Sequence, residues 1–300
     1  MRKIVADLHN HSTFSDGDYS PEELIEEAGK KGIEYFALTD HDSILGIEAA
    51  LRAGKESNLK VIPGVEITLR FRHADFVGSL HILLYFSEAL FKNEVFKENL
   101  NCIVAQGRGA ALNIERVRSI NQMFGPRGRQ PLLKKLLTVA EIAELSPNVS
   151  RRHFVMALER NHGLSREQIT MLIGNDSPAY VPSGVDMKEL AGLIKDYPVL
   201  AVLAHPAAGS FPGDSHYKEV LPPLDIVEKL LPEFFKLGVK GIEVWYPGHT
   251  KEHKAYLSEL ARQKKLVVTG GSDCHDSFAR PLGKEGLTEQ ELEQFLEAIV

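Results

Sequence analysis

Residue types that bind metal ions follow five short apolar runs of this chain. They are His9 and His11 after residues 4–8, Asp40 and His41 after 36–39, Glu66 after 61–62, His205 after 200–204, and Asp273 and His275 after 267–269. His9 and His11 are two residues apart, as are Asp273 and His275, so on an extended chain both members of a pair point the same way. Imidazole and carboxylate together suit zinc, manganese or iron. We therefore expect a metal centre.

The apolar runs are typical of β strands, because they are short and many are rich in β-branched residues. The predicted strands are residues 4–9, 35–39, 59–63, 80–86, 199–204, 241–245 and 266–269. The predicted helices are residues 21–31, 45–57, 230–237, 251–264 and 289–299, the first starting at the N-cap and Pro of Ser20-Pro21-Glu22-Glu23. Alternation of the two predicts an α/β fold with a parallel sheet or barrel, whose strand ends meet at one active-site rim.

The alternation is interrupted between residues 91 and 182. Helices are predicted there at residues 113–123, 138–145, 151–160 and 166–173, separated by breaks such as Phe124-Gly125-Pro126. We therefore expect a barrel domain of residues 1–90 and 183–300, with an inserted helical subdomain at 91–182.

Each metal-binding signal is weak when taken alone. His9 and His11 could be ordinary polar residues at a strand end, and a single His205 is more often a core or rim histidine. His81 lies within the apolar run at residues 80–84, where a structural role is the commoner outcome. The metal centre is favoured because five separate strand ends supply ligand types together.

The composition limits the remaining classes of function. No apolar run approaches the length that spans a membrane, and residues 1–7 lack the layout of a secretory signal. Cys102 and Cys274 stand in unlike contexts, so we expect no disulfide and a cytoplasmic location. The net charge of −6 argues against binding of duplex DNA, although residues 92–176 contain 13 Lys and Arg against 8 Asp and Glu. That basic segment could bind an anion, or it could be a solvated helix surface.

Several motifs together resemble one known family. They are Asp7-Leu8-His9-Asn10-His11-Ser12, Ser15-Asp16-Gly17, Leu38-Thr39-Asp40-His41-Asp42, Pro63-Gly64-Val65-Glu66, Ala204-His205-Pro206 and Gly271-Ser272-Asp273-Cys274-His275. In this order they resemble the PHP family (polymerase and histidinol phosphatase). The layout from Pro178 to Val244 is similar to the branch of small stand-alone phosphoesterases. The resemblance implies a distorted (β/α)7 TIM-like barrel with two or three divalent ions, of manganese, zinc or iron.

The resemblance also implies a set of ligands. One ion would take His9, His11, Glu66 and Asp273; a second would share Glu66 and add His81 and His205; a third would take Asp16, His41 and His275. The implied activity is hydrolysis of nucleotide phosphomonoesters, such as 3′,5′-bisphosphorylated nucleosides or AMP, by a hydroxide that bridges the ions. The expected partner is a small phosphorylated substrate, a nucleotide or short oligonucleotide.

Four other functions stay open. They are 5′-3′ exoribonuclease activity on short RNA, histidinol-phosphatase-like activity, an amidohydrolase-like metal hydrolase, and a non-catalytic metal-binding module. An amidohydrolase of this type would usually need a metal-bridging lysine, and no Lys follows a predicted strand in that context. The sequence does not determine the oligomeric state.

The helical segment offers candidates for substrate binding. Arg151, Arg152 and His153 begin a predicted helix after Ser150, where cationic donors meet a helix N-terminus that favours anions. Arg116 lies on a neighbouring predicted helix. The family usually has Arg-Pro-His at these positions, so the resemblance implies Arg151 and His153, whereas Arg152 departs from the pattern. A solvated basic helix is the alternative.

Asp7, Asp40 and Asp42 are placed to fix the tautomers of the ligating histidines, and Asp40 could instead protonate the leaving oxygen. The remaining polar and aromatic candidates are assigned structural roles. They are His73, His162, His216, His249 and His253, then Trp245 and Tyr246, which could alternatively stack on a base, and Cys274, which we interpret as an inert spacer.

Overall fold

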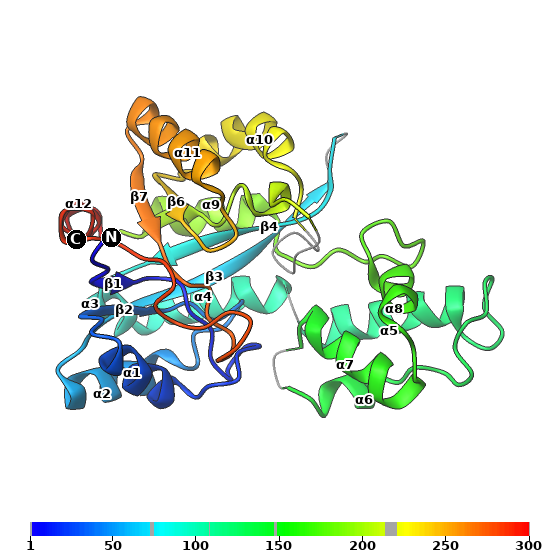
Figure 1. The fold of residues 1–300 in the computed structure, drawn as a ribbon. Coiled ribbons are helices and arrows are strands. Elements are labelled where there is room, and N and C mark those ends of the chain that lie inside the picture. Colours follow the sequence, from blue (N-terminus) through cyan, green and yellow to red (C-terminus); the bar gives the residue numbers. More distant parts are fainter. Residues whose placement is uncertain (1, 73–74, 108, 147–148, 214–220, 300) are drawn as a thin grey trace.

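Seven strands form one continuous sheet in a computed structural model that describes residues 2–72, 75–107, 109–146, 149–213 and 221–299. The strands pair in chain order: β1 (Ala6–Asp7), β2 (Tyr35–Leu38), β3 (Lys60–Arg72), β4 (Val77–Tyr85), β5 (Leu200–Leu203), β6 (Gly241–Trp245) and β7 (Val267–Gly270). The first and last strands approach each other, since Leu8 N donates to Gly270 O at 3.2 Å and Asn10 bridges Cys274. The α/β barrel predicted from the sequence is confirmed (Figure 1).

One strand runs against the others. β4 is antiparallel to β3 and to β5, whereas the remaining neighbours are parallel. The cause is the short connection at residues 73–76, because only a crossover of a dozen or more residues can return a chain to a parallel strand. β3 also extends nine residues past the predicted end at Pro63, to Arg72. Glu66 therefore lies within a strand and not beyond its end, whereas His81 lies within β4, inside the strand predicted at residues 80–86.

Helices cover the outside of the barrel (Figure 1). They are α1 (Pro21–Lys30), α2 (Ile47–Ser57), α3 (Glu88–Phe91), α4 (Glu94–Gly107), α9 (Met187–Asp196), α10 (Leu224–Leu237), α11 (Lys251–Lys264) and α12 (Glu289–Ala298), with a 3-10 turn at Ala208–Ser210. The predicted start of α1 is confirmed, since the Ser20 hydroxyl accepts from Glu23 N and the Glu23 carboxylate accepts from Ser20 N. Three helices, α3, α4 and α9, were not predicted as such.

Two apolar layers hold the barrel in place. Inside it, Val202, Leu83 and Ile62 pack with Tyr85, whose hydroxyl donates to Leu8 O at 2.7 Å. A larger layer lies between the sheet and the outer helices α4, α9 and α10. Full burial of each large apolar side chain contributes about 1.5–3 kcal/mol. The barrel is thus a rigid base for the polar residues at its rim.

The remaining helices are α5 (Ala110–Phe124), α6 (Val139–Ala143), α7 (Arg151–His162) and α8 (Arg166–Ile173). They gather beside the barrel in Figure 1 and share an apolar cluster of their own, which includes Phe124, Phe154 and Leu172. Phe96 and Leu100 of α4, by contrast, belong to the cluster of the barrel. The division of the chain at residues 91 and 182 stays a prediction. The packing supports a separate subdomain for α5–α8, because these helices share their own apolar cluster. No described helix is long and apolar enough to cross a membrane.

Candidate metal centre

Glu66 lies at the centre of a buried group of imidazoles. Its side chain has an exposed fraction of 0%. The Oε2 atom lies 3.3 Å from His9 Nε2, 3.2 Å from His11 Nε2 and 2.9 Å from His41 Nδ1, and the Oε1 atom lies 2.8 Å from His81 Nδ1 and 2.9 Å from His205 Nε2. One carboxylate is therefore shared by five histidines that come from different parts of the chain.

The potential ligand atoms form three overlapping groups. They are His9, His11, Glu66 and Asp273; then His41, Glu66 and His81; then His11, Asp16, His41 and His275, with all atoms of a group within 4.8 Å of one another. His205 adjoins the second group, since its Nε2 lies 3.3 Å from His81 Nδ1. In the third, Asp16 Oδ1 lies 3.2 Å from His275 Nε2 and 4.0 Å from His41 Nε2.

The structure thus brings together all nine residues predicted as ligands. The first group contains the residues that the resemblance implies for one ion, while His11 and His41 each belong to two groups. His81 and His205 both contact Glu66, as a shared ligand would require. Which ion each residue holds stays a prediction.

The group fits divalent cations on chemical grounds. The atoms His9 Nε2, His11 Nε2, Asp16 Oδ1 and Glu66 Oε2 are buried and make no hydrogen bond of good geometry within the described part of the chain. Buried polar atoms in proteins nearly always have a partner. These atoms instead face one another at 3–4 Å, as atoms that share an ion do. Their nitrogen and carboxylate chemistry suits zinc, manganese or iron.

The electrostatics of the metal-free group favour ionised carboxylates, which can bind a cation, and a protonated His11, which cannot. Burial would raise the pKa of Glu66, but His41 and His81 hold it well below its usual range. Burial likewise acts against the charged form of His11, but the facing carboxylates of Asp273 and Glu66 raise its pKa to about 9. In the metal-free protein the carboxylates are ionised and His11 is protonated at neutral pH. Ions that bind must therefore displace protons.

Unusual backbone conformations place two of the ligands. His205 and Asp273 have φ angles of 28° and 50°, in the left-handed region that such residues seldom adopt. The neighbouring Gly271 packs against His9, since a Cβ atom there would lie 2.3 Å from His9 N. Conformations of this kind persist where the surroundings impose them, and they gather at functional sites.

Glu243 orients two of the histidines, and sequence reasoning missed it. It lies on β6 with no exposure. Its Oε1 atom is 2.9 Å from His9 Nδ1, and its Oε2 atom accepts from His205 N at 2.7 Å. A carboxylate on Nδ1 leaves Nε2 of His9 available for an ion. A lone Glu within the apolar strand Gly241-Ile242-Glu243-Val244 was the signal that could have identified it.

Two side chains hold the second oxygen of Asp273. Tyr246 donates its hydroxyl hydrogen to Asp273 Oδ2 at 2.9 Å, and Arg280 Nη1 donates to the same atom at 3.3 Å. The Oδ1 atom faces His11 Nε2 at 3.0 Å. Tyr246 is buried, so it is not available to stack on a base, and its hydroxyl serves a proposed ligand. Arg280 was not identified from the sequence.

The three aspartates predicted to fix histidine tautomers have different described partners. Asp40 accepts from Ser12 N at 2.6 Å and Ser15 Oγ at 2.6 Å; Asp7 accepts from Ser272 N and Oγ; Asp42 accepts from Thr68 N and Oγ1. The described bonds join these carboxylates to serine and threonine residues, and their role in fixing histidine tautomers stays a prediction. Burial raises the pKa of Asp40. Its role as an acid stays a prediction, while its contacts favour a positioning role.

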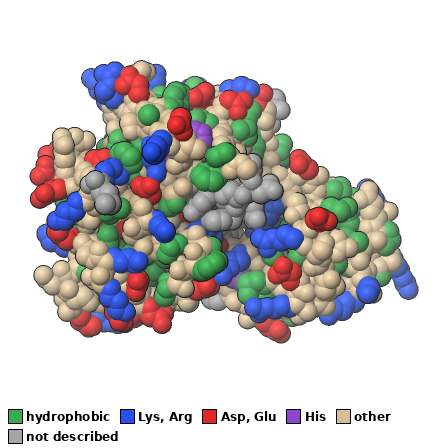
Figure 2. Space-filling model, in the orientation of Figure 1, with side chains coloured by type: hydrophobic (Ala, Val, Ile, Leu, Met, Phe, Trp, Pro, Cys, Tyr) green, Lys and Arg blue, Asp and Glu red, His purple; other side chains and the backbone are tan. Residues whose placement is uncertain are grey.

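Only one of the four predicted substrate-binding residues has described contacts with the metal centre. Arg152 donates to Asp16 O at 2.6 Å and to Asp18 Oδ1 at 2.9 Å. The described bonds of the others lie within the helical segment: Arg116 Nε to Val181 O, Arg151 to Asn175 Oδ1 and Ile173 O, and His153 Nδ1 with Ser150. His153 is also buried. Figure 2 shows Lys and Arg side chains where this segment adjoins the barrel.

The other candidates have structural surroundings. His249 accepts from Ala207 N and contacts Val244 O, and burial lowers its pKa to about 3. His253 caps α11, and Trp245 donates to Glu291. His162 lies 3.6 Å from Glu141, and burial raises the pKa of Cys274 to about 12, which keeps it a neutral thiol. His73 and His216 lie outside the described residues.

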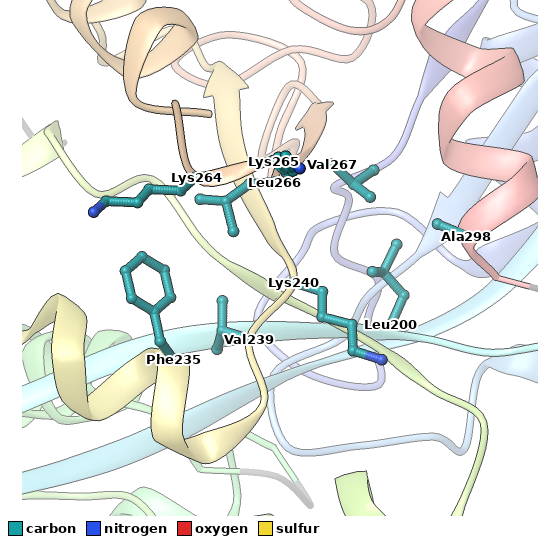
Figure 3. A pocket seen from close by; sticks show the side chains of 9 residues that line it. All are labelled: Leu200, Phe235, Val239, Lys240, Lys264, Lys265, Leu266, Val267 and Ala298. Atoms are coloured by element: carbon teal, nitrogen blue, oxygen red, sulfur yellow. The ribbon is translucent and has the colours of Figure 1, made fainter. Parts of the chain in front are cut away.

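A cavity of about 510 Å³ lies at the other end of the barrel (Figure 3). Leu200 and Val267, at the starts of β5 and β7, line it together with Lys240, Lys264 and Lys265. Most of the proposed ligands, such as His9, His41, His205 and Asp273, follow the opposite strand ends. In barrels of this type the site lies at the C-terminal strand ends, so we assign function to the histidine group and not to this cavity.

Curated relatives match almost the whole chain. A phosphoribosyl 1,2-cyclic phosphate 1,2-diphosphodiesterase from Eggerthella lenta is 29% identical, with 92% of this chain and 96% of the relative covered. A 5′-3′ exoribonuclease from Haemophilus influenzae is 28% identical, with 90% of this chain and 89% of the relative covered. A 3′,5′-nucleoside bisphosphate phosphatase from Chromobacterium violaceum is 26% identical, with 90% of this chain and 86% of the relative covered.

The fold has a solved counterpart, and a family model matches the sequence. A crystal structure from Bifidobacterium adolescentis, of a protein described as a metal-dependent phosphoesterase, superposes with a TM-score of 0.70 at 24% identity and covers 100% of this chain and 98% of its own. The family model described as the PHP domain matches residues 7–175, which include six of the nine grouped ligands. Because that match spans more than half of the 300 residues, the chain belongs to the PHP domain family.

Proposed function

We propose that this chain, a metal-dependent phosphoesterase of the PHP family, hydrolyses phosphate esters of small ribose-containing molecules. The first candidates are phosphomonoesters of nucleotides, such as 3′,5′-bisphosphorylated nucleosides or AMP. The observation that supports this best is the position of Glu66, shared by five imidazoles and flanked by Asp16 and Asp273 at one end of the barrel. Nitrogen and carboxylate ligands packed this closely suit two or three ions of manganese, zinc or iron.

The residues around the ligands provide the order that such chemistry needs. Bound ions would lower the pKa of water and neutralise the phosphoryl oxygens of an anionic substrate. Glu243 fixes the ring of His9, and Tyr246 fixes the carboxylate of Asp273. Because these groups are buried, they need little rearrangement when charge shifts on the phosphoryl group.

A second candidate is hydrolysis of a cyclic phosphodiester of a phosphorylated ribose. The relative from Eggerthella lenta favours it, because it matches this chain over nearly the full length of both proteins. The contacts of Arg151 and His153 also favour the cyclic phosphodiester over a bisphosphate. Both residues are engaged inside the helical segment, so the argument for a second phosphate site on a bisphosphate loses its direct support. The match to an exoribonuclease keeps short 5′-phosphorylated RNA as a further substrate to be measured.

A C–N bond hydrolase is less well supported. In the described ion pairs of Asp16, Glu66 and Asp273 the partners are His and Arg, and a Lys that could bridge ions is absent from these pairs. A purely binding role is also disfavoured, because three curated relatives that match about nine-tenths of the chain are named as enzymes that act on phosphate esters.

The test is a panel of substrates for the protein reconstituted with Mn²⁺. Release of phosphate, or ring opening, would be measured for 3′,5′-adenosine bisphosphate, AMP, a ribose 1,2-cyclic phosphate, 5′-phosphorylated RNA and histidinol phosphate. We expect metal-dependent turnover of a ribose phosphate ester that His9→Ala abolishes and that His253→Ala, at the start of α11, retains. Bound ions with no hydrolysis of any ester would reject the phosphoesterase proposal.

A further inference from the structure

Arg280 is carried on a rigid turn directly after the metal-binding pair Asp273 and His275. Its main-chain oxygen accepts from His275 N at 3.1 Å. The Asp276 carboxylate closes the turn by accepting from Phe278 N at 2.8 Å and Arg280 N at 3.2 Å. The position of Arg280 relative to the metal centre is therefore fixed by the backbone and does not depend on a mobile side chain alone.

The guanidinium has donors to spare. Its Nη1 atom donates to Asp273 Oδ2 at 3.3 Å, which is the single hydrogen bond of this side chain within the described residues. A guanidinium offers five N–H donors in a planar fork. The side chain has an exposed fraction of 25%, compared with 6% for Asp273. One part of Arg280 thus touches a proposed ligand, while another part can be reached from solvent.

The charge balance also suggests an anionic partner. Among the described residues, Arg280 is the one Lys or Arg whose side chain pairs with a side chain of the histidine and carboxylate group. Two divalent ions would balance the four carboxylates of Asp16, Glu66, Asp273 and Glu243, and a third ion would leave an excess of positive charge. Arg280 adds a permanent positive charge that pairs with Asp273, and this charge beside bound ions would attract an anion.

We propose that Arg280 binds the phosphoryl group of the substrate. It donates N–H hydrogens to a non-bridging phosphoryl oxygen, while Asp273 Oδ2 holds the other side of the guanidinium. The planar fork matches phosphate geometry, and the charge on these oxygens is stabilised as the ester bond breaks. This role rests on the proposed phosphoesterase function and gives the phosphoryl group a cationic partner directly beside Asp273.

The test compares four variants of the full chain loaded with Mn²⁺. Arg280→Gln removes the charge, and Arg280→Lys keeps it without the fork. Tyr246→Phe removes the other hydrogen bond to Asp273 Oδ2, and Arg262→Gln, on exposed α11, is the control for an Arg to Gln change. Three quantities are measured: bound metal per chain, the inhibition constant of inorganic phosphate, and kcat/KM for the best ester.

We expect Arg280→Gln to retain its metal, to weaken inhibition by phosphate about tenfold and to lower kcat/KM about 100-fold. Arg280→Lys should recover part of both losses, and Arg262→Gln should match the wild type. If Arg280→Gln and Tyr246→Phe both lose metal and recover full turnover in excess Mn²⁺, Arg280 merely positions Asp273 and the proposal is wrong. If the wild type hydrolyses no ester, the phosphoesterase function fails separately, and direct calorimetry of phosphate binding to Arg280→Gln and wild type still decides this inference.

Discussion

Arg152 on the first turn of α7 donates a hydrogen bond to the main-chain oxygen of Asp16, at 2.6 Å, and a second to Asp18 Oδ1. The barrel side of this contact is already fixed, since Gly17 N donates to Ser12 O and Asp18 N to His275 O. The contact therefore docks the helical segment onto a rigid loop of the metal centre. Arg152, which departs from the family pattern, supplies a link between the two parts.

We predict that Arg152→Ala loosens α7 relative to the barrel. Hydrogen bonds to a charged group contribute about 1.5–3 kcal/mol, and exposed ion pairs about 0–1 kcal/mol. We expect faster hydrogen exchange across α7 and a three- to tenfold higher KM (about 1 kcal/mol by the tenfold rule) for a substrate that extends beyond its reacting phosphate. Arg160→Ala, an exposed change on the same helix, is the control.

An unchanged exchange rate in Arg152→Ala would show that other contacts dock α7. Ser146 Oγ, 3.4 Å from Ser15 O, is one such contact. The double variant with Ser146→Ala would then separate the two.

Glu243→Gln is predicted to weaken metal binding without unfolding the barrel. The amide of Gln can still accept from His205 N but lacks the charge that supports His9 Nδ1. Loss of such an outer partner typically lowers metal affinity 10- to 100-fold. Competition with a fluorescent chelator would measure the affinity, with Glu259→Gln on exposed α11 as the control. Equal affinities in both variants would show that Glu243 has no such role.

Tyr85→Phe tests the support beneath the metal centre. The Tyr85 hydroxyl donates to Leu8 O across the interior of the barrel, and Leu8 precedes His9. Its removal leaves a buried carbonyl without this partner, which costs about 1–3 kcal/mol. Chemical denaturation should show a lower free energy of unfolding with an unchanged slope. A stability equal to that of the wild type would mean that another donor replaces the hydroxyl.

Much of the candidate ligand group was predictable from the sequence, partly because strands place residues by simple periodicity and partly because the family resemblance added residues such as Asp16. His9 and His11 leave one strand on the same face, and Asp273 and His275 repeat this spacing. Glu66 was expected beyond a strand that ends at residue 63, but it lies within β3. The strand that carries His81 was predicted, but the four-residue connection after β3 makes it run antiparallel. Alternation predicted a parallel sheet or a barrel, and the family resemblance pointed to the barrel.

Contacts between distant segments could not be predicted. The link from Arg152 to Asp16 and the bond from Glu243 to His9 join residues separated by 136 and 234 positions. No periodicity connects such residues. Arg151 and His153 were chosen because a helix N-terminus favours anions, but capping and packing inside the helical segment use both side chains.

The free energy of unfolding should fall with rising pH in the metal-free protein and change much less in the metal-loaded protein. Without metal, His11 has a pKa of about 9 in the folded state against an ordinary 6.5. A raised folded pKa gives stability that is fully present below pH 6.5 and is lost as the pH rises through about 9. The free energy of unfolding of the metal-free protein should thus fall by up to about 3 kcal/mol over this range. Ions compete with the proton on His11, so metal affinity, and the stability gained from metal, should increase over the same interval.

Thermal unfolding at pH 6.5 and 9, with EDTA or with Mn²⁺, measures both slopes. Parallel slopes in the two conditions would mean that His11 does not exchange a proton for an ion, and would remove it from the ligand set.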